Sequence, residues 1–206
     1  MNIGTKSLLF GVHQVFIHPL WVALAWWKLY GFPWDPRLWV AFIVHDWGYW
    51  GCSEMDGPNG GDMHPRVGAE IMHWLFDKML YYSDPQSCHG LQFNDWYFFC
   101  MCHSRFLSKQ MCKQPSKLCM ADKLSLGLEP WWLYLPRAWV SGELKEYMKS
   151  AEPGGKHGHM NLGQVSAITW YKSVQDYLKK YVEEHKDGKK DEVTEVDVRY
   201  SGNSGV

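Results

Sequence analysis

The chain has 206 residues, a length that fits one domain with some chain to spare. Its 21 Lys and Arg residues nearly balance its 22 Asp and Glu residues, so no overall charge favours a nucleic acid polymer or an anionic membrane as partner. The sequence shows no secretory leader pattern. We therefore expect the six Cys residues to be reduced thiols in a cytoplasmic protein.

The most apolar stretch near the start of the chain, residues 8–27, contains His13, Gln14 and His18. A transmembrane helix needs an unbroken apolar run of about 20 residues, so we expect a buried helix here and no membrane span. Pro19 is expected in the first turn of that helix. Apolar residues at helical spacing predict helices over about residues 7–30, 37–47, 65–80, 94–107, 116–126, 128–149 and 162–185.

No segment alternates apolar and polar residues over a sustained length, so the sequence predicts an all-α fold. We expect one helical domain over residues 1–185. Residues 186–206 are charged, contain Gly and have few apolar side chains, a composition typical of a disordered tail. Cys100 and Cys102 lack the spacing of a zinc ribbon, so both are expected in the core.

The dipeptide His45-Asp46 ends a predicted helix that is otherwise apolar. Such a dipeptide is a weak signal by itself, but its position is informative. A carboxylate without a partner in apolar surroundings is costly, and a cation removes this cost by taking both groups as ligands. The sequence therefore predicts a metal site at the end of this helix.

Four more residues of the same types lie in or beside other predicted helices: His18, His64, His103 and Asp122. Mixed imidazole and carboxylate ligands suit iron, manganese, zinc and similar ions. His13 competes with His18 for the first ligand position, because residues five apart do not share one face of a helix squarely. His13 is instead a candidate for substrate contact.

The order His, His-Asp and Asp along helices resembles the HD superfamily of metal-dependent phosphohydrolases. Three segments carry this resemblance: HPLWVALA (residues 18–25), LWVAFIVHDWG (residues 38–48) and ADK (residues 121–123). HPRVGAEI (residues 64–71) and the segment around His103 are similar to the two-metal branches, such as the HD-GYP phosphodiesterases and the bacterial diadenosine tetraphosphate hydrolases. Together these five segments extend over about residues 13–135.

The resemblance implies an HD-domain helical bundle with two divalent transition-metal ions. It implies that His18, His45, Asp46 and Asp122 hold one ion, and that Asp46 bridges to a second ion held by His64 and His103. His45 and Asp46 would then be catalytic, with Glu70 or Asp62 as an outer base. Tyr49 stands where many two-metal members have Lys, and no Gly-Tyr-Pro signature is present, which speaks against cyclic dinucleotide cleavage.

The expected substrate is a small phosphate-bearing molecule, because two cations neutralise charge on a phosphoryl group. Arg66, Arg105 and Lys109 are candidate phosphate contacts, and Tyr49 could stack on a base. Two other functions stay open: an HD-fold di-iron oxygenase that cleaves a carbon bond with O₂, and a nucleotide sensor without turnover. The sequence is compatible with a homo-oligomer and with one or two ions.

Overall fold

The structure, a computed structural model, describes residues 1–57, 61–77, 95–155, 162 and 165–187. These residues form helices and contain no strand, which confirms the predicted all-α class. Two short 3-10 turns, η1 (Trp47–Tyr49) and η2 (Gly61–Met63), and a π-helical turn, η3 (His73–Asp77), accompany the α-helices. The α-helices are α1 (Ile3–Phe10), α2 (His18–Tyr30), α3 (Pro36–Val44), α4 (Pro65–Met72), α6 (Asp95–Met101), α7 (Arg105–Gln110), α8 (Lys117–Leu128), α9 (Trp131–Ser141), α10 (Glu143–Ser150) and α11 (Ala167–His185).

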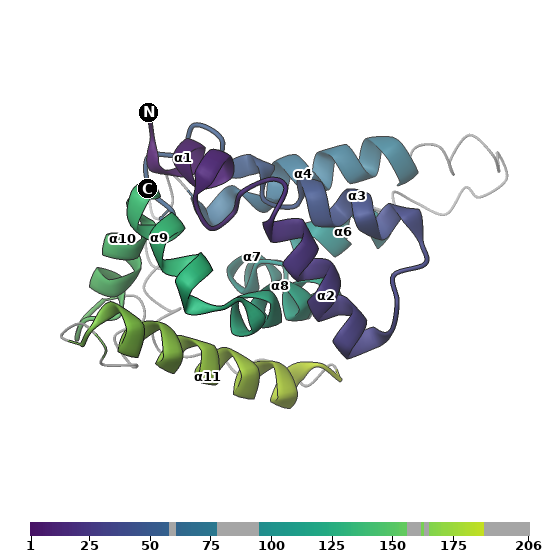
Figure 1. Ribbon diagram of the computed structural model, residues 1–206. Helices are drawn as coiled ribbons and strands as arrows, with labels where there is room; N and C mark the ends of the chain where they lie inside the picture. Colours follow the sequence, from purple (N-terminus) through teal and green to yellow (C-terminus); the bar gives the residue numbers. More distant parts are fainter. Residues whose placement is uncertain (58–60, 78–94, 156–161, 163–164, 188–206) are drawn as a thin grey trace, which may run out of the picture.

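Helix α8 has α2 packed on one side and α11 on another, and Figure 1 shows α11 along one edge of the molecule. Helix α4 packs on α6, and α1 and α10 both pack on α9. The largest core cluster joins Trp26 of α2, Phe42 of α3 and Leu118 of α8, with Cys100 and Leu107 from α6 and α7. Burial of these large apolar side chains is the main force that holds the helices together.

Helix starts follow local signals in the sequence. Proline stands in the first turn of α2, α3 and α4, where its missing N–H costs nothing; for α2 this is the predicted Pro19. The side chains of Asp35, Ser104, Ser116 and Ser166 each accept a hydrogen bond from a first-turn backbone N–H. Such caps satisfy N–H groups that have no partner within the helix.

In place of the expected helix over residues 7–30, α1 ends at Phe10 and α2 begins at His18. The chain turns at Gly11, where a Cβ atom would lie 2.4 Å from Oε2 of Glu143. The Gln14 side chain then accepts hydrogen bonds from the N–H groups of Phe16 and Ile17 and leads into α2. These tertiary and side-chain contacts override the helical periodicity of the segment.

Other expected helices also end earlier or divide. Helix α3 ends at Val44, before the expected end near residue 47. Two helices, α6 and α7, stand in place of the single helix expected over residues 94–107. Two others, α9 and α10, stand in place of the helix expected over residues 128–149, with the break at Gly142, whose φ is +93°. Helix α11 begins at Ala167 rather than near residue 162. The end of the helix expected over residues 65–80 and residues 188–206 of the expected tail lie outside the described residues.

Cys100 and Cys102 are buried in the core as predicted. The Cys residues in the described part of the chain form no disulfide, and Cys88 lies outside that part. None of the helices in the described residues is both long and apolar enough to cross a membrane.

Candidate metal centre

The six predicted metal ligands converge from five separate places in the fold, and most of them lie at helix ends. His18 is the first residue of α2, and His64 is the N-cap of α4; each is followed by proline. His45 is the C-cap of α3, Asp46 follows it, and His103 follows α6. Asp122 differs from the other five because it lies in the interior of a helix, α8. At a helix end the chain turns, so a side chain there can point between helices rather than along one face.

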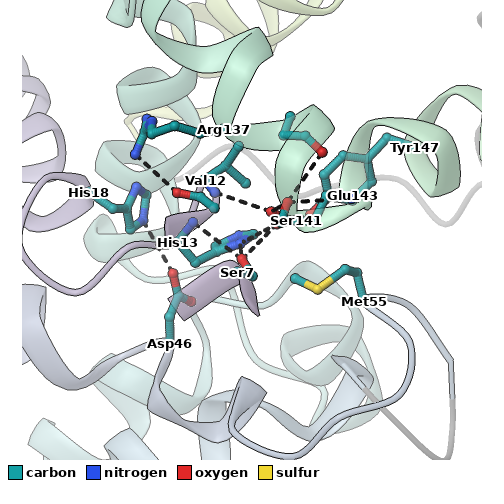
Figure 2. Close-up of polar contacts among 12 residues, drawn as sticks. Ser7, Val12, His13, His18, Asp46, Met55, Arg137, Ser141, Glu143 and Tyr147 are labelled. Atoms are coloured by element: carbon teal, nitrogen blue, oxygen red, sulfur yellow. Dashed lines mark hydrogen bonds and ion pairs between the residues drawn. The ribbon is translucent and has the colours of Figure 1, made fainter. Parts of the chain in front are cut away.

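The first ligand group consists of His18, His45, Asp46 and Asp122. His18 Nε2 lies 3.2 Å from Oδ2 of Asp46 and 3.1 Å from Oδ1 of Asp122; Figure 2 shows its contact with Asp46. His45 Nε2 lies 3.2 Å and 3.8 Å from the same two oxygens. Two ligand atoms bound tetrahedrally to one ion, each about 2.1 Å from it, are about 3.4 Å apart, so these separations suit a single bound ion.

The second group consists of Asp46, His64 and His103. The Nε2 atoms of the two imidazoles lie 3.0 Å apart, and they are 3.5 Å and 3.4 Å from Oδ1 of Asp46. The two carboxylate oxygens of Asp46 therefore face different groups: Oδ2 faces the first and Oδ1 the second. Each oxygen of Asp46 therefore belongs to a different one of the two groups that could hold a metal ion.

The hydrogen bonds of the imidazoles orient their Nε2 atoms as metal ligands. Nδ1 of His45, His64 and His103 each lies in hydrogen-bond contact with the carbonyl oxygen of the residue three positions earlier. A carbonyl only accepts, so Nδ1 carries the proton, and Nε2 of a neutral ring offers a lone pair. Such a second contact fixes the ring orientation of metal-binding histidines.

The same geometry leaves lone pairs of buried ligand atoms without a partner, and a bound cation would supply one. Oδ2 of Asp46 is buried and has no hydrogen-bond partner among the residues that the structure describes, although two imidazole nitrogens lie 3.2 Å away. In the second group two Nε2 atoms 3.0 Å apart face each other, and two lone pairs at that distance repel. The described side chains thus form two groups that could hold a metal ion, and the donor set fits a divalent transition metal.

Burial and charge shift the pKa values of these side chains in opposite directions. Burial lowers the pKa of His18, but the close contacts and charges of Asp122 and Asp46 outweigh it and raise the pKa to about 9. Burial, together with the neighbouring imidazole of His103, lowers the pKa of His64 to about 3. The carboxylates of the first group therefore require positive charge, which either protons or a bound cation supply.

Two glycines allow the backbone segments that carry the ligands to approach closely. A Cβ atom on Gly48 would lie 2.0 Å from the carbonyl oxygen of His64, and one on Gly68 would lie 2.6 Å from that of Val44. Gly68 belongs to α4 and Val44 ends α3. Any larger side chain would separate the His45-Asp46 turn from the segment that begins at His64.

Tyr49 and His13, the predicted substrate contacts, lie beside the centre. The Tyr49 ring stacks on His64 with centroids 4.1 Å apart and is buried. Burial and nearby carboxylates raise its pKa well above the ordinary value, so the phenol stays neutral. The His13 ring lies 4.7 Å from Tyr49 and 5.6 Å from His18, between centroids. His13 lies in the turn between α1 and α2 rather than on a helix face shared with His18.

The other predicted site residues lie in η2, α4 and α7. Arg66 and Glu70 form an ion pair with each other on the exposed side of α4, with an N···O distance of 2.8 Å. The guanidinium of Arg105 lies over the ring of Tyr181 at 4.5 Å, which connects α7 to α11. Asp62 is buried and Lys109 is partly exposed. Roles in catalysis or phosphate binding for these residues stay predictions.

Sequence reasoning missed Glu143, which lies fully buried next to His13. It also missed the buried ion pair of Glu129 and Arg137, whose guanidinium donates to the carbonyl of Gly11 as well. Glu143 begins an amphipathic helix, where an acidic residue is ordinary because it favours the positive end of the helix dipole. No local signal distinguishes it from an exposed residue.

Comparisons with protein-family models, with curated proteins and with solved structures give no match for this chain.

Proposed function

We propose that this chain is a metal-dependent phosphohydrolase of the HD type, which cleaves a phosphate ester or anhydride of a nucleotide-like substrate. One observation carries the proposal: the two carboxylate oxygens of Asp46 face two separate groups of His and Asp side chains. A centre that could hold two neighbouring ions suits the displacement of a leaving group at phosphorus. The order of the ligands along the chain is the second support.

When bound, two divalent cations would lower the pKa of a water molecule toward neutrality and neutralise charge on a phosphoryl oxygen. The residues of the chain perform the remaining tasks. The backbone carbonyls behind His45, His64 and His103 keep these rings in one tautomer and orientation. The Tyr49 ring covers one face of the His64 ring, and the His13 side chain beside Tyr49 keeps 18% of its surface exposed.

The test combines metal analysis with a substrate panel. We expect the purified protein to contain iron, manganese, cobalt, nickel or zinc and to release phosphate from nucleotides or simple phosphate esters in the absence of oxygen. Asp122→Asn should lower metal content and turnover together. Asp176→Asn, an exposed change on α11, is the matched control and should retain both. A metal-free protein, or a metal-loaded one inactive on the whole panel, would contradict the proposal.

A di-iron oxygenase on the same fold is the second candidate. The observation that favours it is Tyr49, a buried phenol stacked on His64 at a position where many two-metal phosphohydrolases carry Lys. The same panel separates the two reactions. Turnover of a small organic substrate that requires both iron and O₂ favours the oxygenase, whereas phosphate release without oxygen favours the hydrolase.

A further inference from the structure

The end of α3 with η1 and the start of α4 with η2 are neighbouring stretches that share an exposed apolar side. They run antiparallel, because Gly48 lies against His64 and Gly68 lies against Val44; Figure 1 shows α3 beside α4. The side chains one position after these four contact positions are buried: His45, Tyr49, Pro65 and Ala69. Those one position before them are exposed and apolar: Ile43, Trp47, Met63 and Val67.

Helix geometry explains this division into an inner and an outer side. Successive residues of a helix are rotated by about 100° around its axis, so the positions just before and just after a contact point to opposite sides. In an antiparallel pair, the positions before the contact lie on the same side in both segments. The inner side carries His45 of the candidate metal centre, and the outer side faces solvent.

The outer side continues along α4 into η3. Ile71 and Trp74 follow Val67 at helical spacing, and a groove of about 400 Å³ lies there, lined by Val67, Glu70, Ile71, Trp74 and Leu75. Trp74 keeps 65% of its surface exposed beside this groove. We call the apolar residues of the outer side the α4 face: Ile43, Trp47, Met63, Val67, Ile71, Trp74 and Leu75. It offers both a protruding indole and a hollow next to it.

The exposed area of the α4 face is that of a protein interface. Four of its side chains keep 41–43% of their surface exposed: Ile43, Trp47, Met63 and Val67. With Trp74 added, the exposed parts amount to roughly 500 Å² of apolar surface. A standard interface buries about 800 Å² on each partner, of which about 450 Å² is apolar. The α4 face therefore supplies the apolar area that one side of a stable dimer needs.

Charge does not oppose contact between two copies of this face. The two charged residues of α4 are Arg66 and Glu70. They form an ion pair with an N···O distance of 2.8 Å and so neutralise each other. A surface with charges of one sign repels its own copy, whereas this balanced pair leaves the border of the groove without net charge.

We propose that a second copy of this chain covers the α4 face, with a two-fold axis that crosses the helix between residues 70 and 71. Val67 and Trp74 are seven positions apart, which is about two helical turns. When the two helices pack antiparallel around this axis, Trp74 of each copy lies opposite Val67 of the other. Each indole then enters the groove of the other copy, so one face provides both halves of an isologous contact. This assembly does not depend on the proposed reaction.

Sedimentation of the full chain over a range of concentrations tests the assembly. We expect the wild-type protein to reach twice the mass of the 24.1 kDa chain at micromolar concentration. A Trp residue in a desolvated pocket typically dominates the binding energy of an interface. Trp74→Glu places a charge in both grooves and should raise the dimer Kd by about 30-fold or more. Val67→Glu, at the other end of the same contact, should change the Kd in the same direction.

Trp139→Glu is the matched control. Trp139 is 74% exposed and lies on α9, outside the α4 face, so this variant should keep the wild-type Kd. Circular dichroism establishes that each variant stays helical. If Trp74→Glu does not fold, Val67→Glu decides the question.

A disulfide trap tests the antiparallel arrangement. Ile71 lies next to the proposed axis, so Ile71→Cys should link two copies to each other upon oxidation. Adding Trp74→Glu to the same chain should abolish the link. The wild-type protein, whose Cys112 is exposed, measures the linkage that random collisions produce.

The contrary results are distinct. A dimer that folded Trp74→Glu and Val67→Glu proteins retain unchanged forms through another surface and overturns the proposal. A wild-type protein that stays monomeric at all concentrations also overturns it. If anilinonaphthalene sulfonate binds to such a monomer but not to its Trp74→Glu variant, the groove belongs to a small apolar ligand instead of a second copy.

Discussion

Asp46 is the residue whose replacement tests the candidate metal centre most directly. Asp46→Asn keeps the shape of the side chain and removes its charge, and one of its two oxygens becomes an amide nitrogen that cannot bind a cation. Oδ1 lies 3.4 Å from Nε2 of His103, and Oδ2 lies 3.2 Å from Nε2 of His45. Because the carboxylate faces both ligand groups, we expect this single change to weaken both sites.

The size of the effect follows from linkage between binding and folding. A cation at a free concentration 100 times its Kd adds about 2.7 kcal/mol to the free energy of unfolding, so two independent sites add roughly 5 kcal/mol. A change of 1 kcal/mol moves the Tm of a chain of this size by roughly 2–4 °C. Saturating metal should therefore raise the Tm of the wild-type protein by roughly 10–20 °C, and that of Asp46→Asn by little.

The assay is thermal unfolding with and without added metal, together with elemental analysis of each variant. Asp122→Asn and His103→Gln each alter one ligand group, so each should retain about half of the wild-type metal and stabilisation. Asp176→Asn, which is exposed, serves as the control for loss of a carboxylate. Wild-type metal content in Asp46→Asn would refute the bridging role.

Three further predictions concern contacts made by Gly68, Glu143 and Tyr171. Gly68→Ala places a methyl group 2.6 Å from the carbonyl oxygen of Val44, so urea unfolding should show a loss of about 1–3 kcal/mol; elemental analysis should show less metal, and full metal content would count against this contact. The contacts of Glu143 outweigh burial and lower its pKa below 4.5, so the ionised carboxylate stabilises the fold above that pH and this contribution is lost as pH falls. The urea midpoint of the wild-type protein should then drop more steeply below about pH 5 than that of Glu143→Gln. Parallel curves for the two proteins would contradict this prediction. Tyr171→Phe removes a hydroxyl that lies 3.0 Å from the carbonyl oxygen of Leu126 near the end of α8; we expect a cost of about 1–3 kcal/mol in urea unfolding. The Gln175 side-chain amide also donates to this carbonyl, at 3.1 Å, so wild-type stability would show that Gln175 satisfies it alone.

Helical periodicity identified the stretches that become helices but not where they break. The segment over residues 7–30 is apolar enough for one helix, yet the structure interrupts it over residues 11–17. A similar interruption separates α6 from α7. Both breaks concern the candidate centre, because His13 lies in the first and His103 in the second. Apolar spacing reports which face of a segment is buried, and it says little about a turn that distant residues stabilise.

The sequence by itself determined the helical class and pointed to six His and Asp residues that the structure brings together. It could do so because a carboxylate or imidazole in an apolar helix is costly without a partner, so its presence there is a local signal. Only the tertiary structure decided that the two oxygens of Asp46 face different groups and that Glu143 lies behind His13. His13 and Glu143 are 130 positions apart, and a contact at that separation depends on how whole helices pack rather than on any local pattern.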